Sequence, residues 1–266
     1  MHFREKVIWV TGASSGIGAE LAVQLAKQGG YVILTGRNEQ ALNEVHQACS
    51  KYNEFCKIVV ADLSTEAGCL QACNQAMELF QHIDIVFLNA GVTQRSLAID
   101  TDIAVYRSLM DINFYAPLII TKQLLPYFKQ RNNGQIVAIS SVAGLMGFPL
   151  RSGYAAAKHA MKGFFETLQT ENTIEGLSIT LVSPGRINTP ISVNALTKDG
   201  TPHLKHDEGQ LNGISVKVCA TKILKAVAQK KQHIIIARGE SLLLKIKWYL
   251  PSLYYKIAHN KGLKSL

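Results

Sequence analysis

The sequence predicts an α/β domain built around a doubly wound parallel sheet. Short apolar runs alternate with helical patterns along nearly the whole chain of 266 residues. This length suits a single domain that buries about three quarters of the surface its unfolded chain exposes. The chain shows no low-complexity segment and no internal repeat. Short apolar strands separated by amphipathic helices indicate a parallel sheet that helices cover on both faces.

Seven apolar runs are expected to form the strands of this sheet. In chain order they cover 6–11, 32–35, 57–61, 83–88, 135–140, 178–182 and 233–237. Seven strands in such an alternation predict a ligand site at the carboxyl ends of the strands.

A glycine-rich turn follows the first strand immediately. It reads Gly12-Ala13-Ser14-Ser15-Gly16-Ile17-Gly18, and a helical pattern runs from Ala19 to Gln28. A strand, a glycine loop and a helix in this order are the setting that a dinucleotide site requires. The glycines let the backbone approach a pyrophosphate, and the helix N-terminus offers free N–H groups. A glycine-rich turn without a ligand is the alternative for the loop taken alone.

Tyr154 and Lys158 are spaced i, i+4, so a helix would present both side chains on one face. A free phenol titrates near ~10, and an ammonium group within a few ångströms favours the phenolate and lowers that pKa. Such a pair can exchange a proton with an alcohol or a ketone near neutral pH. Taken alone, the spacing is weak evidence for such a site, because most pairs of this kind are mere surface pairs on a helix.

Taken together, these motifs resemble the short-chain dehydrogenase/reductase family. The glycine loop has that family's Thr-Gly-x-x-x-Gly-x-Gly spacing, and Asn89-Ala90-Gly91 ends the fourth strand as in the family. Ser141 stands thirteen residues before Tyr154, Asn113 lies in Met110-Asp111-Ile112-Asn113, and a Pro-Gly segment runs from Pro184 to Thr189. The resemblance covers residues 5 to about 236 and implies a single Rossmann-type domain with a seven-stranded parallel sheet.

The resemblance implies four catalytic residues: Asn113, Ser141, Tyr154 and Lys158. Tyr154 would donate its proton to the developing alkoxide, and Ser141 would hydrogen-bond the same oxygen. Lys158 would lower the pKa of the phenol and contact the nicotinamide ribose. Asn113 would interrupt its helix and hold a water that relays protons to Lys158. An asparagine that kinks a helix for packing is the alternative for Asn113.

The end of the second strand favours NADP(H) as the cofactor. Gly36 occupies the position where an acidic residue usually reads the ribose of NAD, and Arg37 follows it. An arginine fork suits a 2′-phosphate, although a solvated turn residue is the alternative reading of Arg37. The residues expected to contact the cofactor are Gly12, Ser14, Ser15, Gly16, Ile17, Gly18, Arg37, Asn38, Asp62, Leu63, Asn89, Ala90, Gly91, Tyr154, Lys158, Pro184, Gly185, Ile187 and Thr189.

The net charge of +9 lies entirely in the last 45 residues, which hold ten lysines and arginines and one acid, Glu240. We therefore divide the chain into a catalytic domain, 1–238, and a basic amphipathic helical extension, 239–266. Within the extension, the stretches 241–250 and 253–257 join apolar, aromatic and basic residues. They fit a lid over the substrate pocket, a core-packing tail or an interfacial helix on a membrane. We expect no nucleic acid partner, since no recognised motif is present.

We expect no metal and no disulfide. His203, His206, Asp207 and Glu208 cluster in a loop, but without a recognised ligand spacing. The five cysteines form no Cys-x-x-Cys pair and fit reduced, buried thiols. The first five residues contain no apolar run, and we expect a cytoplasmic protein that touches membranes at most peripherally.

The sequence thus predicts an NADPH-dependent oxidoreductase. It would transfer a hydride between nicotinamide and the carbonyl or secondary alcohol of an apolar substrate, lipid-, steroid- or 3-oxoacyl-like. The alternative is a non-catalytic nucleotide-binding regulator on the same fold. The family resemblance also implies a homodimer or homotetramer, paired through helices at about 102–131 and 153–172.

Overall fold

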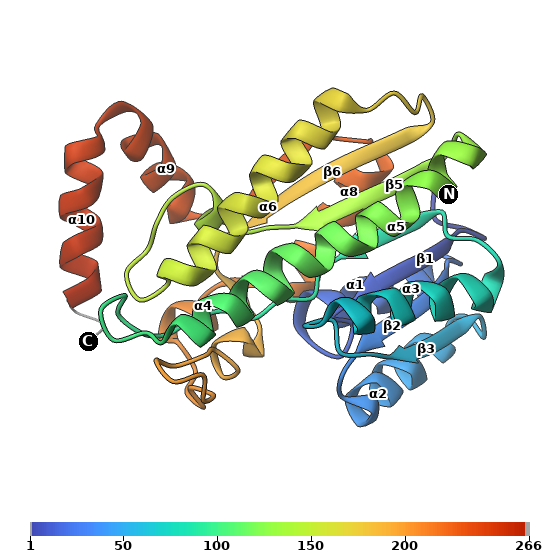
Figure 1. The fold of residues 1–266 in the computed structure, drawn as a ribbon, viewed down its shortest axis with the longest axis horizontal. Helices are drawn as coiled ribbons and strands as arrows, with labels where there is room; N and C mark the ends of the chain where they lie inside the picture. The colour runs from blue at the N-terminus through green and yellow to red at the C-terminus, as the bar shows by residue number, and fades with distance from the viewer. Residues whose placement is uncertain (1, 264–266) are drawn as a thin grey trace.

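The computed structural model describes residues 2–263 and contains the predicted seven-stranded, wholly parallel sheet (Figure 1). The strand order is β3-β2-β1-β4-β5-β6-β9, so the chain winds outward from β1 to one edge and then from β4 to the other. The strands are β1 (Val7–Thr11), β2 (Tyr31–Gly36), β3 (Cys56–Val60), β4 (Ile85–Leu88), β5 (Gly134–Ile139), β6 (Leu177–Pro184) and β9 (His233–Ile236). All seven expected strands are confirmed, with ends that shift by at most two residues.

Helices cover both faces of this sheet. The helices are α1 (Gly16–Lys27), α2 (Glu39–Ser50), α3 (Glu66–Phe80), α4 (Ile103–Met110), α5 (Ala116–Arg131), α6 (Ser152–Glu171), α7 (Glu208–Leu211), α8 (Val216–Ala228), α9 (Gly239–Tyr249) and α10 (Pro251–Leu263). Buried side chains of α1, α2 and α8 share one core cluster, and those of α3, α5 and α6 share another. A small separate sheet pairs β7 (Ile187–Asn188) with β8 (Ile214–Ser215).

The central strand β1 shows why the strands read as continuous apolar runs. Ile8 and Val10 pack into the cluster with α1, whereas Val7 and Trp9 pack into the cluster on the opposite face. All four side chains are fully buried. A strand that is covered on both faces needs apolar residues at every position. Packing on both faces also fixes the positions of the strand ends.

The glycine turn after β1 is tight, and α1 begins inside it. The helix starts at Gly16 rather than at the expected Ala19. Gly12 and Gly16 have φ of +64° and +57°, which is backbone that favours glycine. At Gly18 an added Cβ would lie 2.2 Å from the carbonyl oxygen of Gly12. Glycine at these positions therefore lets the loop fold back closely on the start of α1.

A π-helical segment, Asp111–Tyr115, joins α4 to α5 and makes one helical stretch, Ile103–Arg131. Within residues 2–263 this is the one stretch whose length and composition would allow it to cross a membrane. Its α5 part instead packs on the sheet of this domain, with Ile120, Leu124 and Phe128 buried in the core.

The C-terminal extension forms the helices α9 and α10, which pack against each other and against the loop after β5 (Figure 1). Leu244 and Tyr254 form a buried cluster with Val142, Leu145 and Met146 of that loop. The Lys247 ammonium donates to the Leu145 carbonyl oxygen at 2.7 Å, and the Tyr254 hydroxyl donates to the Gly147 carbonyl. The two helices are thus fixed onto the loop after β5 by both apolar packing and hydrogen bonds.

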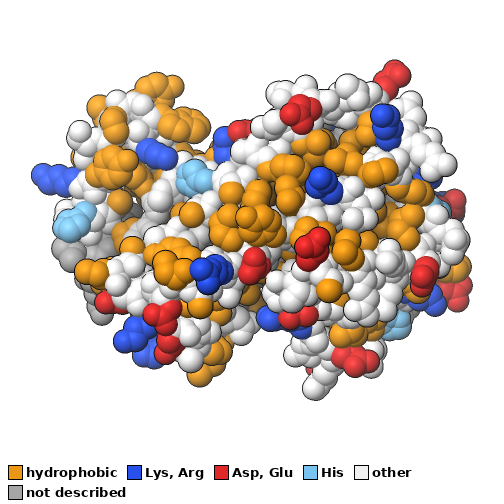
Figure 2. All heavy atoms as spheres, in the orientation of Figure 1, with side chains coloured by type: hydrophobic (Ala, Val, Ile, Leu, Met, Phe, Trp, Pro, Cys, Tyr) orange, Lys and Arg blue, Asp and Glu red, His pale blue; other side chains and the backbone are white. Residues whose placement is uncertain are grey.

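The other face of the extension is apolar and open to solvent. Trp248 is 60% exposed, Tyr249 80% and Tyr255 65%. Figure 2 shows hydrophobic side chains gathered over α9 and α10, with lysine side chains among them. Both faces of the extension are therefore rich in apolar side chains, but the inner face is buried and the outer face is exposed.

Candidate functional site

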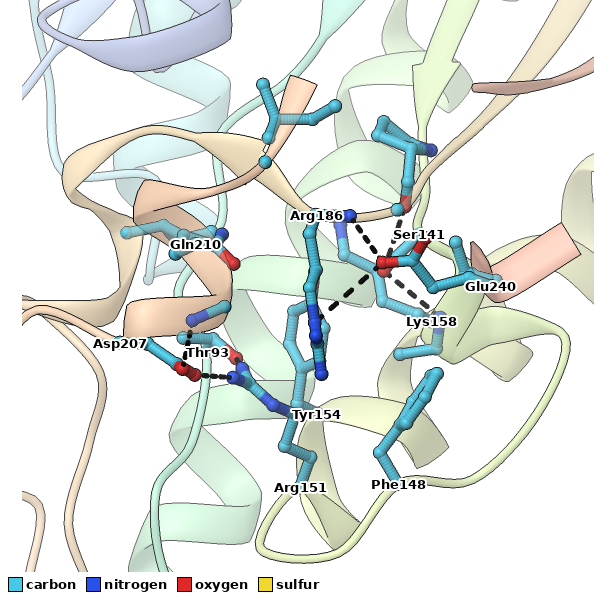
Figure 3. Close-up of a pocket in the computed structure, with 18 of the residues that line it drawn as sticks. Thr93, Ser141, Phe148, Arg151, Tyr154, Lys158, Arg186, Asp207, Gln210 and Glu240 are labelled. Atoms are coloured by element: carbon cyan, nitrogen blue, oxygen red, sulfur yellow. Dashed lines mark hydrogen bonds and ion pairs between the residues drawn. The ribbon is translucent and has the colours of Figure 1, made fainter. Parts of the chain in front are cut away.

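A cavity of about 690 Å³ opens at the carboxyl ends of β4, β5 and β6 (Figure 3). The structure brings all four predicted catalytic residues, Asn113, Ser141, Tyr154 and Lys158, into its wall. They come from the π segment, the end of β5 and the first turns of α6. Four separate positions of the sequence therefore meet at one edge of the sheet, as the strand topology predicts.

Tyr154 and Lys158 lie one turn apart on α6. The start of this helix is held by Gln94, which belongs to none of the sequence motifs. The buried Gln94 side chain accepts hydrogen bonds from the backbone N–H groups of Gly153, at 2.7 Å, and Tyr154, at 3.4 Å. Arg151, in the N-cap position, makes no side-chain capping bond, so Gln94 satisfies those amide donors instead. This contact fixes the backbone of Tyr154 from a loop that lies 60 residues earlier.

Burial dominates the electrostatics of the Tyr154–Lys158 pair. Burial raises the pKa of Tyr154, while the Ser141 hydroxyl and then the Arg151 guanidinium lower it. Burial also lowers the pKa of Lys158 to about 7, so a large fraction of this amine is neutral at neutral pH. The Lys158 nitrogen lies 5.9 Å from the centre of the Tyr154 ring and donates to the Ile139 carbonyl at 3.0 Å.

These values differ from the expectation that Lys158 depresses the Tyr154 pKa. In the free protein the groups that lower it are Ser141 and Arg151. The physical reason is that Lys158 is itself desolvated and carries less charge, since a buried ammonium loses its hydration.

Ser141 follows β5 directly and is placed by a short turn. Its hydroxyl oxygen accepts from the Ala143 N–H at 3.1 Å, and the hydroxyl reaches the Pro184 carbonyl at 3.4 Å. The neighbouring Ser140 is buried, and its hydroxyl donates to the Lys158 carbonyl at 3.3 Å. Both serines line the cavity, but Ser141 is the one whose hydroxyl acts on the Tyr154 phenol.

Asn113 interrupts its helix, as expected, because it sits inside the π segment. Its amide nitrogen donates to the carbonyls of Val92 and Leu109, each at 2.9 Å. Its buried Oδ1 has no hydrogen-bond partner among the described protein atoms. A Cβ added to Gly91 would lie 2.6 Å from this Oδ1 and 3.6 Å from the Lys158 nitrogen. A buried acceptor without a hydrogen-bond partner in the wall of the cavity is poorly explained by packing alone.

The expected cofactor residues divide into two groups. Ile17, Asn89, Gly91, Tyr154, Lys158, Pro184, Gly185, Ile187 and Thr189 line the cavity. The remaining ones, Gly12, Ser14, Ser15, Gly16, Gly18, Arg37, Asn38, Asp62, Leu63 and Ala90, lie outside its lining. They lie on the glycine turn and past the ends of β2, β3 and β4, and β1, β2 and β3 are adjacent in the sheet. A dinucleotide would therefore run from the cavity along this edge.

The glycine turn fits a pyrophosphate, whereas some neighbouring side chains already have partners. Ser15 precedes α1 in extended backbone and makes no side-chain capping bond, so the first amides of α1 keep free donors. By contrast, Asn38 caps α2 by accepting from the Ala41 N–H, and Asp62 accepts from the Ser64 N–H. Asn89 donates to the carbonyls of Thr11 and Gly12 and so braces the turn. The exposed Arg37 lies past the end of β2.

The far wall of the cavity contains charged residues that the motif search did not single out. Arg95 and Arg151 both contact the same carboxylate oxygen of Asp207, at 2.9 and 3.1 Å. Arg186 pairs with Glu240 at 3.8 Å. These residues follow no short motif, because they come from five separate places in the chain that only the fold brings together.

The C-terminal extension supplies part of the cavity wall as well. Leu243 of α9 and Tyr254, Ile257 and Ala258 of α10 line it together with Phe148 of the loop after β5. This arrangement matches the lid or core-packing reading of the extension.

The described residues include no group of three or more His, Cys, Asp or Glu side chains that could hold a metal ion. The side chain of Glu208, the fourth member of the loop cluster with His203, His206 and Asp207, lies outside the described residues. All five cysteines are free and buried.

Comparisons with known proteins agree with this geometry. A family model described as short chain dehydrogenase matches residues 6–200. Dehydrogenase/reductase SDR family member 7B of Bos taurus is 33% identical over 99% of this chain and 83% of its own length. Dehydrogenase/reductase SDR family member 7 of Homo sapiens is 34% identical over 98% of this chain and 79% of its own length.

Solved structures show the same fold. A short chain dehydrogenase/reductase from Burkholderia phymatum, in complex with NAD, superposes with a TM-score of 0.86 at 22% identity, covering 95% of this chain and 96% of that one. Levodione reductase superposes with a TM-score of 0.81 at 24% identity, covering 90% of this chain and 99% of that one.

Proposed function

The chain belongs to the short-chain dehydrogenase/reductase family of oxidoreductases, and we propose that it is NADPH-dependent and acts on the carbonyl or secondary alcohol of an apolar substrate. The observation that carries the proposal is the meeting of Asn113, Ser141, Tyr154 and Lys158 in one cavity. A nucleotide-binding regulator would have no chemical use for all four groups at one site.

The nicotinamide cofactor supplies the hydride when it is bound, and the residues of this chain handle the proton. Tyr154 donates its phenolic proton to the substrate oxygen, which the Ser141 hydroxyl holds by a hydrogen bond. Lys158 is poised to take up or release a proton near neutral pH, because burial lowers its pKa to about 7. The unpartnered Asn113 Oδ1 beside it suits a relay through water to Lys158.

The choice of NADPH rests on the end of β2. Gly36 leaves no carboxylate for a ribose 2′-hydroxyl, and a side chain there would meet the Ser14 hydroxyl oxygen at 3.4 Å. The exposed Arg37 follows it with its guanidinium available to a 2′-phosphate. The Burkholderia structure is in complex with NAD, which supports a nicotinamide dinucleotide here without distinguishing the two forms.

An apolar substrate follows from the walls that the extension contributes. Leu243, Tyr254 and Ile257 face the cavity together with Phe148. Removal of apolar ligand surface from water against these walls favours binding. A lipid-, steroid- or 3-oxoacyl-like skeleton would use this surface, whereas a small polar ketone would not.

The proposal also covers the cellular location, the oligomeric state and the membrane contact of the protein. We place it in the cytoplasm, as a homodimer or homotetramer paired through α4–α5 and α6, where Ile103 and Tyr115 are exposed. The outer face of α9 and α10 would make a peripheral contact with membranes. Gel filtration with light scattering tests the assembly.

The direct test of the proposed function is an assay of nicotinamide oxidation with a panel of ketones. We expect turnover with apolar ketones, and a higher kcat/KM with NADPH than with NADH. Absence of turnover with every ketone and of oxidation with every matching alcohol would favour the regulator. A higher kcat/KM with NADH than with NADPH would refute the assignment of the cofactor but leave the proposed reaction intact.

A further inference from the structure

Two arginines share one carboxylate in the wall of the catalytic cavity. Arg95 and Arg151 both approach the Oδ2 atom of Asp207, at 2.9 and 3.1 Å. All three side chains are largely buried, with 17 to 20% of each exposed. Figure 3 shows Arg151 reaching toward Asp207 and Thr93 on one side of Tyr154 in that view, with Phe148 on the other side.

This cluster carries a surplus positive charge. Two guanidinium groups face one carboxylate, and an arginine stays charged in a protein. Burial lowers the pKa of Arg151, and repulsion by Arg95 lowers it further. The net charge of the whole cavity lining is also positive. The described lining includes the arginines 95, 151, 186 and 238 but only two acids, Asp207 and Glu240. A buried surplus charge is costly unless a counter-charge neutralises it.

The cluster also has unused donors. A guanidinium offers five N–H donors. Arg151 uses two nitrogens, on Thr93 at 2.7 Å and on Asp207, while the described contacts of the Arg95 side chain involve one nitrogen only. Both residues line the cavity, so remaining donors of the pair can face a bound molecule.

The geometry of the cluster is held in advance. Asp207 accepts the Gly209 N–H on its other oxygen, and its own N–H donates to the Ser192 hydroxyl. The Arg95 backbone N–H donates to the Leu196 carbonyl at 2.8 Å. Holding the loop around Asp207 would need only one of the two arginines, so loop anchoring leaves the second arginine unexplained.

We propose that Arg95 and Arg151 form a carboxylate subsite, so that the carbonyl substrate of this cavity is an oxo acid with an aliphatic skeleton. Planar guanidinium groups match the geometry of a carboxylate and bind it through paired hydrogen bonds. The apolar wall of Phe148, Leu243 and Ile257 takes the skeleton, and Tyr154 takes the carbonyl oxygen. This inference rests on the proposed function and narrows its substrate class from apolar to amphipathic and anionic.

The test compares medium-chain oxo acids, with the ketone at varied positions, against their own methyl esters on the intact protein. Hydrogen bonds to a charged group correspond to about a ten- to a hundredfold effect. We expect kcat/KM for the best acid to exceed that of its ester by about this factor. Equal values, or faster reduction of the esters throughout, would overturn the subsite while leaving the proposed function intact.

Variants at Arg95 test whether this residue causes the higher kcat/KM for the acid than for the ester. Arg95→Gln removes the charge and should reduce the ratio of acid to ester kcat/KM about tenfold or more, whereas Arg95→Lys should restore part of it. The matched control is Arg4→Gln, because Arg4 is an exposed arginine that precedes β1, whose opposite, carboxyl end faces the site. A ratio that Arg95→Gln leaves unchanged would contradict the assignment. If Arg95→Gln does not fold, Arg95→Lys and the wild-type ratio still decide it.

A readout independent of turnover separates this inference from the proposed function. Isothermal titration of a saturated medium-chain carboxylate should show binding at least about tenfold tighter than its methyl ester, and high salt should weaken that binding. Carboxylate binding without reduction of any ketone would refute the proposed function but retain the subsite. Reduction of ketones without selective carboxylate binding would refute the subsite but retain the proposed function.

Discussion

Tyr154 is the residue on which the proposed chemistry depends most directly. Tyr154→Phe removes the only proton that this side chain can donate and keeps the ring in its buried place on α6. We expect turnover to fall at least about a hundredfold, which is within the usual range for the loss of a general acid. The dissociation constant of NADPH, measured by fluorescence titration, should stay within about twofold. Retention of more than about a tenth of the wild-type rate would refute the role.

Arg37 is the residue that should separate the two cofactors. A charge-assisted bond to a 2′-phosphate is worth roughly 1.5–3 kcal/mol. Arg37→Ala should therefore weaken NADPH about ten- to a hundredfold and leave NADH nearly unchanged. Arg37→Lys serves as the matched control, because it keeps the charge and loses the fork. Equal losses for the two cofactors would show that this side chain does not read the phosphate.

At the scale of elements, the inner face of the α9–α10 extension should govern substrate affinity. The variant Lys247→Ala with Tyr254→Phe deletes both hydrogen bonds from the extension to the backbone of residues 145–147. Each such bond contributes about 0.5–1.5 kcal/mol. We expect KM for an apolar ketone to rise several-fold with a smaller change in kcat, because the loosened wall belongs to the substrate part of the cavity. An unchanged KM would argue against a lid.

The outer face of the same helices makes a separate prediction. Trp248, Tyr249 and the exposed Lys245 and Lys256 suit the headgroup region of an anionic membrane. Lys247 of the same stretch does not belong to this face, because its ammonium group donates to the Leu145 carbonyl. The proposed peripheral contact predicts co-sedimentation with acidic vesicles that weakens as salt rises. Trp248→Ser with Tyr249→Ser should lower it and leave KM unchanged. Absence of vesicle binding at every salt concentration would rule the contact out.

At the scale of the whole molecule, the buried Lys158 should shape the pH dependence of stability. Its pKa falls from 10.5 to about 7 on folding. Between these values the unfolded chain binds more protons than the folded chain, so this residue makes the free energy of unfolding increase with pH. Its destabilising effect is complete below about pH 7 and is relieved as pH rises toward 10.

Lys158→Met tests this effect by urea unfolding of the free protein. The variant lacks the titrating group, so its stability relative to wild type should decrease by roughly 2 kcal/mol between about pH 7 and pH 9. The thiols of Cys69 and Cys73, whose pKa values are raised by burial, are common to both proteins, so their contributions cancel in the difference. A difference that stays constant over this range would contradict a lysine that is desolvated in the fold.

The sequence alone determined the features that depend on local patterns. Each strand of the sheet is marked by its own apolar run, since strands covered on both faces need apolar residues throughout. Gly12, Gly16 and Gly18 mark a turn whose close approach excludes a side chain. The four catalytic candidates, Asn113, Ser141, Tyr154 and Lys158, follow from the resemblance that the motifs of the chain carry to the short-chain dehydrogenase/reductase family.

Only the tertiary structure decided the contacts between segments far apart in the chain. Gln94 holds the start of α6, the two arginines at 95 and 151 meet Asp207, and the extension docks on the loop after β5. No spacing encodes these contacts, because each depends on how loops close over a completed sheet. The low pKa of Lys158 has the same origin, since desolvation depends on everything that surrounds the amine rather than on its neighbours in sequence.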